Sequence, residues 1–165
     1  MKKFIIALIA VFALSTVAMA QGNSEKYAIG LRLGGGYGYG VEASFHLGGL
    51  PNLNRVELDL GWNGYGYGGY NHNYLYLTGT YQWRWNIVAG LHWYVGPGAA
   101  LGLWTGSDID PYFTVGIGGQ IGIEYDFDFP LQLSLDFRPM WHFMDPWHNH
   151  GWIHPDGGFG VRYRF

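Results

Sequence analysis

The sequence predicts an all-β fold: an eight-stranded antiparallel up-and-down β-barrel that spans a membrane, preceded by a cleaved signal peptide. Three observations favour this fold. The last eight residues, 158–165, alternate between apolar residues and glycine or arginine, which puts the two sets on opposite faces of a strand. Aromatic residues make up 19 % of the chain, whereas charged residues make up 13 %, about half of the usual ~25 %. Seven earlier segments repeat the alternation.

The first twenty residues have the features of a secretory signal peptide. These features are a positive start at Lys2 and Lys3, an apolar run over 4–14 and a small-residue cleavage site at Ala18-Met19-Ala20. The apolar run is shorter than the ~20 residues that a membrane-spanning helix needs. We therefore expect residues 1–20 to be the signal peptide and residues 21–165 to form one outer-membrane β-barrel domain.

Charge and cysteine content exclude some partners and chemistries. Without Lys2 and Lys3, the 9 basic residues become 7, against 12 acidic ones, which gives a net charge of about −5 with histidine neutral. Such a surface makes nucleic acid an unexpected partner. The chain has no cysteine, so we expect neither disulfides nor thiol chemistry.

The first four strands share one rule, in which apolar side chains face outward and small or polar ones inward. In the first strand, Leu31 and Leu33 would point outward and Arg32 inward. Clusters of glycine, proline and asparagine separate the strands. The strands are expected at 26–35, 41–47, 56–63 and 75–85, with turns or loops at 36–40, 48–54 and 64–73 and a tight turn at Asn86.

The last four strands are expected at 87–96, 118–129, 131–142 and 158–165. Pro97 would end the fifth strand, because proline cannot donate to the hydrogen-bond ladder. The intervening segment 99–117 continues the alternation and is expected to form a hairpin above the membrane, tipped by 105–111. Its exposed edges could capture a strand of a surface protein partner. Among the outward residues, Leu58, Ile121 and Leu133 are expected near the membrane midplane.

Aromatic residues on the expected outer face fall into two belts, one at each membrane interface. The periplasmic belt would hold Trp83, Trp85, Tyr125, Phe127, Tyr163 and Phe165, and the outer belt Trp62, Trp141 and Phe143. Two such belts are typical of transmembrane barrels. A soluble sandwich or a lipocalin-like barrel is the alternative. Those folds place apolar residues inside and would leave this outer face in water.

The inward-facing positions carry an unusual number of charges. The expected lumen network consists of Arg32, Glu42, Glu57, Asp59, Arg84, Glu124, Asp136, Arg138 and Arg162. An eight-stranded barrel is only wide enough for side chains to fill it, so charges inside must pair or cost several kcal/mol each. The favoured interpretation is a plugged, structural lumen. A narrow channel with a gated ion path through rearranged pairs is the alternative.

The chain ends on an aromatic residue, with Tyr163, Arg164 and Phe165 completing the last strand. This ending resembles the C-terminal signal read by the outer-membrane barrel assembly machinery, with Tyr163 and Phe165 as the signal residues. Together with the alternating strands, it makes the chain similar to the small eight-stranded outer-membrane β-barrels of the OmpX/OmpA type. The resemblance implies a location in the outer membrane of a Gram-negative bacterium and contact with lipid and lipopolysaccharide. It also implies a structural or surface-interaction role in the cell envelope. We expect no cofactor.

A lipid-modifying enzyme is a further alternative. Some eight-stranded barrels act on lipid A, and this chemistry needs a Ser or Asp with a His near the outer leaflet. His92, Ser107 and His142 are candidates, but no local motif of the lipid A deacylases or acyltransferases is matched. We therefore expect no catalytic activity. A Ser hydroxyl and a His ring within hydrogen-bond reach at the membrane rim would contradict this expectation.

The expected fourth outer loop, 144–156, has an unusual composition, with three His, two Asp and two Trp. Neutral imidazole suits Zn, Cu or Ni, and a His-x-His pair can chelate such a metal. His148, His150 and His154 are therefore candidate metal ligands. Their spacing matches no closed zinc site, so a loop that merely lies at the headgroup level is the favoured interpretation.

Overall fold

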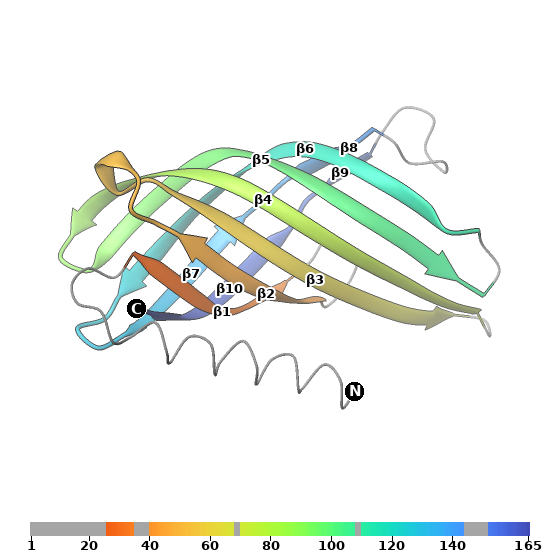
Figure 1. Ribbon diagram of the computed structural model, residues 1–165, viewed down its shortest axis with the longest axis horizontal. Coiled ribbons are helices and arrows are strands. Elements are labelled where there is room, and N and C mark those ends of the chain that lie inside the picture. Colours follow the sequence, from red (N-terminus) through yellow and green to blue (C-terminus); the bar gives the residue numbers. More distant parts are fainter. Residues whose placement is uncertain (1–25, 35–39, 68–69, 108–109, 144–151) are drawn as a thin grey trace.

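The computed structural model describes residues 26–34, 40–67, 70–107, 110–143 and 152–165. Its strands are β1 (Tyr27–Gly34), β2 (Gly40–Leu47), β3 (Arg55–Tyr67), β4 (Tyr70–Val88), β5 (Leu91–Gly106), β6 (Tyr112–Asp126), β7 (Leu131–Phe137), β8 (Met140–His142), β9 (Trp152–His154) and β10 (Gly157–Arg164). A 3-10 turn, η1 (Pro51–Leu53), follows β2. Figure 1 shows the strands wrapped into one tilted barrel. In the described part of the chain, no helix is long and apolar enough to cross a membrane.

Ten strands make eight barrel strands, because two of the eight are interrupted. β7 and β8 both pair with β6 without a change of register, so together they form one barrel strand. β10 pairs with β7 and β9 pairs with β8, again in a single register, so β9 and β10 form the other. Each interruption contains a proline, Pro139 in one and Pro155 in the other, which removes a ladder donor. The amide of Arg138 still donates to the carbonyl of Asp156 at 2.6 Å, so the wall stays hydrogen-bonded there.

The sheet closes on itself with a stagger of ten residues. Neighbouring strands pair in the order β5-β4-β3-β2-β1-β10-β7-β6, and β5 then pairs with β6. Following paired residues once around the ring from Phe113 in β6 leads back to β6 at Ile123, ten residues further on. Eight strands with this stagger tilt by about 40° and enclose a radius of about 8 Å. The predicted eight-stranded antiparallel barrel is confirmed.

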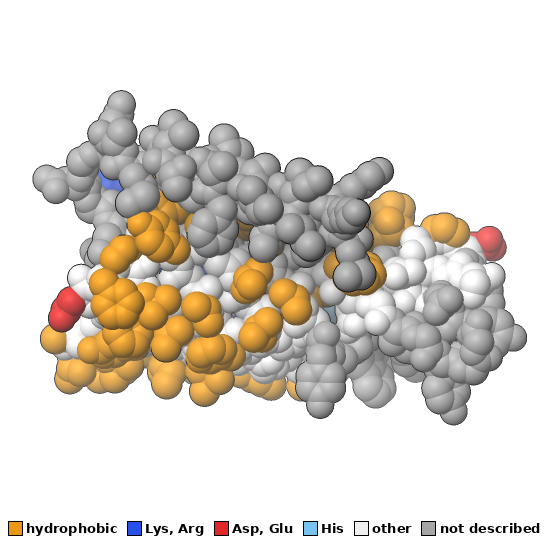
Figure 2. Space-filling view, turned by 90° about the horizontal axis from the view of Figure 1, so that it is seen from below, with side chains coloured by type: hydrophobic (Ala, Val, Ile, Leu, Met, Phe, Trp, Pro, Cys, Tyr) orange, Lys and Arg blue, Asp and Glu red, His pale blue; other side chains and the backbone are white. Residues whose placement is uncertain are grey.

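The barrel is polar inside and apolar outside. Arg32, Glu42 and Glu57 are fully buried, whereas Ile121 and Phe137 are 49 % and 46 % exposed. Within the described strands, no Lys, Arg, Asp or Glu lies on the outer face. Figure 2 shows hydrophobic side chains spread over the wall and acidic ones only at the two ends of the visible face. A wall without charge is suited to lipid as its solvent.

Two aromatic belts border this apolar wall. At the end that carries the C-terminus, Trp85 stacks on Trp93 with ring centroids 4.6 Å apart. The short connections 48–54, 89–90 and 127–130 lie at this end, which is the periplasmic end in bacterial barrels. Toward the other end, Trp141 lies beside Phe143. The stagger and tilt separate Trp141 from Trp85 by roughly 20–25 Å along the axis, which matches an apolar band of about 25 Å.

The β3–β4 hairpin is longer than the sequence indicates. Its two strands pair from Arg55 and Gln82 as far as Tyr67 and Tyr70. The expected loop at 64–73 is therefore wrong, and most of these residues are strand. Glycine and asparagine are poor strand formers in isolation, but ladder pairing with a long neighbour overrides that preference.

The tight turn expected at Asn86 is also wrong. β4 continues to Val88, and the chain reverses at Ala89 and Gly90. Gly90 has a φ of 77°, and a Cβ there would lie 2.7 Å from the carbonyl oxygen of Asp126. Glycine is therefore required at this position, which places the turn.

The segment 99–117 forms the expected hairpin, from the Ala99–Ile117 pair to the Trp104–Tyr112 pair, and it continues the barrel strands β5 and β6. β5 runs through Pro97 without a change of register and pairs with β4 on one side and β6 on the other. Only the β4 ladder omits Pro97, which pairs with Gly119 of β6 instead. β6 is in turn covered by β8 over Gly116–Gly118. The edges expected along this segment are thus mostly paired. β5 ends at Gly106 and β6 begins at Tyr112, so the connection between them falls within the expected tip.

The two ends of the chain correspond to the expected final strand and the expected signal peptide. The final strand at 158–165 is confirmed, and β9 extends the same barrel strand back to Trp152, inside the expected loop 144–156. Residues 1–25 lie outside the described residues, so the signal peptide stays a prediction.

Candidate functional site

Two arginines connect strands across the barrel interior, farther from the periplasmic end than the other charged layers. Arg32 of β1 donates to Asp136 of β7 at 2.6 Å and to Glu42 of β2 at 3.1 Å. Arg138, between β7 and β8, donates to Glu42 at 2.7 Å and to Asp59 of β3 at 2.7 Å. The barrel strand of Arg138 lies diametrically opposite β3 in the ring, so this last contact crosses the whole interior.

A second arginine layer lies closer to the periplasm. Arg162 of β10 donates to Ser44 at 2.8 Å, to Ser134 at 2.6 Å and to Glu57 at 3.0 Å. Gln82 donates to the other oxygen of Glu57 at 2.7 Å. Both serine hydroxyls therefore accept bonds from an arginine inside the barrel. Neither is arranged as a nucleophile next to a base.

The third layer lies at the periplasmic mouth. Arg55 of β3 forms a bidentate pair with Glu124 of β6, at 2.9 and 2.5 Å. Arg84 of β4 also donates to Glu124 and reaches Asp126 with a second nitrogen. That same nitrogen lies 3.0 Å from Nδ1 of His92. Two guanidinium groups and two carboxylates thus alternate across the mouth.

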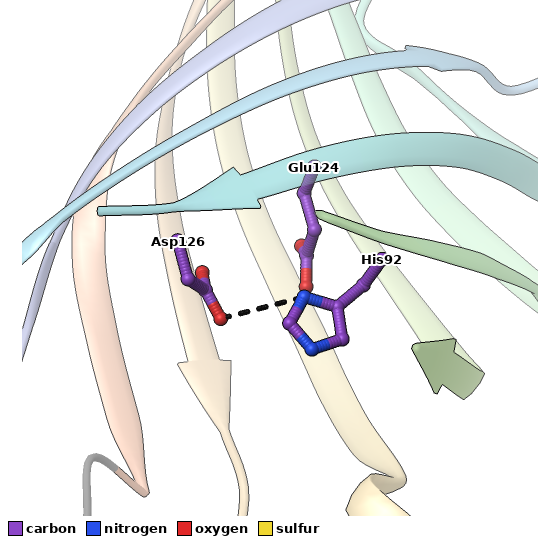
Figure 3. A group of neighbouring side chains, drawn as sticks. All are labelled: His92, Glu124 and Asp126. Carbon is purple, nitrogen blue, oxygen red and sulfur yellow. Dashed lines mark ion pairs between the residues drawn. The ribbon is translucent and has the colours of Figure 1, made fainter. Parts of the chain in front are cut away.

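His92, Glu124 and Asp126 are grouped closely enough to suggest a metal site (Figure 3). Their ligand atoms lie within 4.8 Å of one another, and His92 Nδ1 is 3.7 Å from Asp126. However, Arg84 contacts all three residues. A guanidinium can only donate, so Nδ1 of His92 accepts from it. The position that a metal would need is filled by a fixed cation, so this group is an ion-pair network.

A cavity of about 500 Å³ opens beside this third layer, and we call it the periplasmic vestibule. It is bounded by the start of β1, the end of β2, the start of β3, and residues of β4, β6, β7 and β10. Its lining consists of Lys26, Tyr27, Ala28, His46, Gly48, Gly49, Leu50, Asn54, Arg55, Arg84, Asp126, Gln132 and Arg164.

The extracellular third of the interior is aromatic rather than charged. Tyr74 stacks on Trp104 at 4.5 Å, and both side chains are buried. Trp104 lies in turn 6.3 Å from Tyr112. Tyr76 joins this group to the charged layers, because its ring lies 5.1 Å from Tyr74 and its hydroxyl donates to Glu42 at 2.9 Å.

The structure places all nine charged residues assigned to the lumen network inside the barrel. Eight are at most 6 % exposed, and the side chain of Arg84, at the mouth, is 11 % exposed. The residues are Arg32, Glu42, Glu57, Asp59, Arg84, Glu124, Asp136, Arg138 and Arg162. It also pairs them with one another, and the alternation of each strand taken alone could not specify those partners.

Sequence reasoning missed several members of this network, among them Arg55, Asp126 and Asp156. Arg55 begins β3 in phase with the inward Glu57, one residue before the expected start of that strand. Asp156 accepts from Arg32 at 3.0 Å and from Arg138 at 2.9 Å, although it was assigned to a surface loop. Its parity, which matches that of Arg162, is the signal that could have found it.

The other candidate residues are spread over several elements. His142 is buried in β8, Ser107 is exposed just after β5, and His92 is held by Arg84. His148 and His150 lie outside the described residues. The backbone of His154 pairs with Met140 in the β8–β9 ladder, so this residue belongs to a strand. The His-rich metal site therefore stays a prediction.

No protein-family model and no curated protein matches the chain. Several solved structures resemble it in fold. Neisserial surface protein A has a TM-score of 0.61 at 14 % identity, over 88 % of this chain and all of that one. The N-terminal β-barrel domain of Pseudomonas aeruginosa OprF has 0.58 at 18 %, over 84 % and 96 %. Yersinia pestis Ail, in complex with the heparin analogue sucrose octasulfate, has 0.53 at 12 %, over 84 % and 96 %.

Identities this low establish the fold alone. The matched structures are small outer-membrane barrels, and each is covered almost completely by this chain. This chain adds an outer face without charged side chains over its described strands and two aromatic belts at the spacing of a bilayer. It therefore has the fold and the surface of an eight-stranded outer-membrane β-barrel of the OmpA/OmpX type, a fold of the Gram-negative outer membrane.

Proposed function

We propose that the protein is a closed, non-conducting outer-membrane barrel whose role is structural or carried by contacts of its extracellular side. One observation carries the proposal: arginine–carboxylate pairs cross the interior at several depths. Arg138 reaches Asp59 on the opposite wall, and below it Arg55 reaches Glu124. Opening a continuous water path would require several buried pairs, held in place by further hydrogen bonds, to separate at once.

Conductance tests this proposal. The folded protein is inserted into a planar lipid bilayer, and current is recorded across a range of voltages and in symmetric salt. We expect no discrete steps above the protein-free membrane, since no layer of the network leaves an open path. Reproducible, ion-selective steps would overturn the proposal in favour of a gated narrow channel.

The distribution of charge constrains what the extracellular side can bind. Lys and Arg occur at positions 2, 3, 26, 32, 55, 84, 138, 162 and 164. Of these, the six arginines belong to the interior or the vestibule, and Lys26 lies at the periplasmic end. The sequence of the outer connections, 35–39, 68–69, 107–111 and 143–151, holds three aspartates and no Lys or Arg. The extracellular side is therefore suited to neutral or cationic partners.

This charge pattern argues against carrying over the ligand of one structural neighbour. Ail is seen with a heparin analogue, a polysulfated sugar. A polyanion needs arginine or lysine on the surface that receives it. Cells that display the present protein should retain no more heparin than cells without it. A variant with Asp108→Lys and Asp110→Lys should gain retention. Heparin binding by the unchanged protein would contradict the proposed partner class.

A further inference from the structure

The periplasmic vestibule holds more positive than negative charge. Four cationic side chains line it, those of Lys26, Arg55, Arg84 and Arg164. One lining carboxylate, Asp126, and one carboxylate behind the lining, Glu124, oppose them. Counting these groups leaves a net charge of about +2 at a mouth whose low-dielectric walls concentrate the field. The whole chain has the opposite sign, so this excess is local.

The cationic side chains differ in how many of their donors are already engaged in hydrogen bonds or ion pairs within the protein. Both terminal nitrogens of Arg55 pair with Glu124, and its Nε donates to Gln82. Arg84 uses Nε and Nη2, whereas its Nη1 enters no hydrogen bond among the described residues. Lys26 is exposed and forms no ion pair with any described carboxylate. Two donors, Lys26 Nζ and Arg84 Nη1, are thus available to a ligand in the vestibule.

The size and walls of the vestibule suit a small molecule. Its volume of about 500 Å³ lies within the usual range for ligand pockets, about 300–1,000 Å³. Ala28 and Leu50 provide apolar surface, and Asn54 and His46 provide further polar atoms. The vestibule lies inside the ring at the periplasmic end, because its lining includes residues of strands β1, β2, β3, β4, β6, β7 and β10, whereas the lipid lies outside the wall. A ligand dissolved in the periplasm therefore has more direct access than a lipid headgroup.

We propose that the periplasmic vestibule binds a small soluble anion that carries phosphate or carboxylate groups, with Lys26 and Arg84 as its principal contacts. Arg55 supports the site by neutralising Glu124, which would otherwise repel the ligand. This binding is separate from the proposed closed lumen, because the layers above the vestibule are unchanged by it. A conducting barrel could still bind the anion, and a closed barrel could fail to bind it.

Isothermal titration of the folded protein with pyrophosphate tests the proposal, in dodecyl maltoside micelles that contain no phosphate. We expect one saturable site with a dissociation constant of about 1 mM or tighter at low salt. Lys26→Gln should weaken binding by at least about fivefold, since one charge near the ligand is lost. Lys26 lies outside the strands, so this variant keeps the fold, and Arg84→Lys provides a second variant with unchanged charge and fewer donors.

The matched control is Asp128→Asn, which changes the charge of the same periplasmic end without changing the vestibule lining. The double variant Lys26→Gln, Asp128→Asn restores the net charge and should bind as weakly as Lys26→Gln alone. Absence of saturable pyrophosphate binding would overturn the site. So would a double variant that binds pyrophosphate as tightly as the unchanged protein. Competition by phosphatidylglycerol added to the micelles would overturn the soluble ligand and assign the vestibule to a lipid headgroup.

Discussion

At the scale of single residues, glycines on the inner face determine where the large interior side chains fit. A Cβ at Gly61 would lie 2.2 Å from the ring of Tyr76, and one at Gly122 would lie 2.5 Å from that of Tyr94. A Cβ at Gly158 would lie 2.2 Å from the guanidinium carbon of Arg32. Each missing side chain leaves the space that its neighbour fills. The high glycine content thus follows from the narrow lumen as well as from the turns.

The pair Gly157 and Gly158 gives a direct test of this packing. Gly158→Ala should lower the free energy of unfolding by about 1–3 kcal/mol, because Arg32 must leave its contacts with Asp136. Gly157→Ala should change it by less than about 0.5 kcal/mol, since a Cβ there meets nothing closer than 3.9 Å. Urea unfolding in detergent micelles, followed by tryptophan fluorescence, measures both. Equal effects at the two positions would contradict the explanation.

Arg138 is the residue whose loss should be most costly inside the barrel. It pairs with Glu42, Asp59 and Asp156, so Arg138→Met leaves three carboxylates around a missing cation. We expect a loss of about 3–5 kcal/mol in the free energy of unfolding, with Arg138→Lys intermediate. Thr78→Ser, a change at another buried inward position, should be mild. The same unfolding experiment decides, and a mild effect of Arg138→Met would show that the carboxylates find other partners.

At the scale of the strands, the stagger determines which outward residues lie deepest in the membrane. Leu133 was expected near the midplane, but it pairs with Tyr125 of the periplasmic aromatic belt. Ile121 pairs with Phe137 and Val95, farther from the periplasmic end than Leu133. Depth therefore depends on the position of a strand in the ring as well as on the distance from its turn.

A depth-dependent penalty for arginine tests this arrangement. Ile121→Arg should cost about 2–4 kcal/mol of folding free energy in bilayers, because the charge lies near the midplane. Leu133→Arg should cost only about 0–1 kcal/mol, because its charge can reach the interface. Reversible unfolding from phosphatidylcholine vesicles gives both values. A larger cost for Leu133→Arg than for Ile121→Arg would contradict this arrangement and place the midplane closer to the periplasmic end.

At the scale of the whole molecule, stability depends on the seam at which the first and last strands meet. β1 and β10 pair from Ala28 and Arg164 to Gly34 and Gly158. Beyond that ladder, Tyr27 and Phe165 exchange two backbone hydrogen bonds of 3.1 and 2.9 Å. The terminal residue therefore completes the ring at its periplasmic end, and it is also the residue on which the resemblance to an assembly signal depends.

Deleting Phe165 separates these two roles. In vitro, the refolded variant should lose only about 1–3 kcal/mol, the contribution of two hydrogen bonds and an edge contact. In cells, the heat-modifiable folded form in outer-membrane fractions should fall far more, because the assembly signal is lost. Phe129→Ala, which removes another exposed aromatic residue at the same end, is the control. Normal levels of the deletion in cells would remove the argument for a C-terminal signal.

The sequence alone determined the strand class and the polarity of both faces, because a period of two is a local property of each strand. Arg32 and Leu33 could be assigned to opposite faces from their neighbours alone. It determined the strand ends less well, since the turn at Gly90 and the β3–β4 pairing depend on contacts between strands. Only the tertiary structure decided the stagger of ten residues, and with it the partners inside. Arg138 meets Asp59 and Asp156 because eight registers together bring distant segments to one depth, and no single segment contains that information.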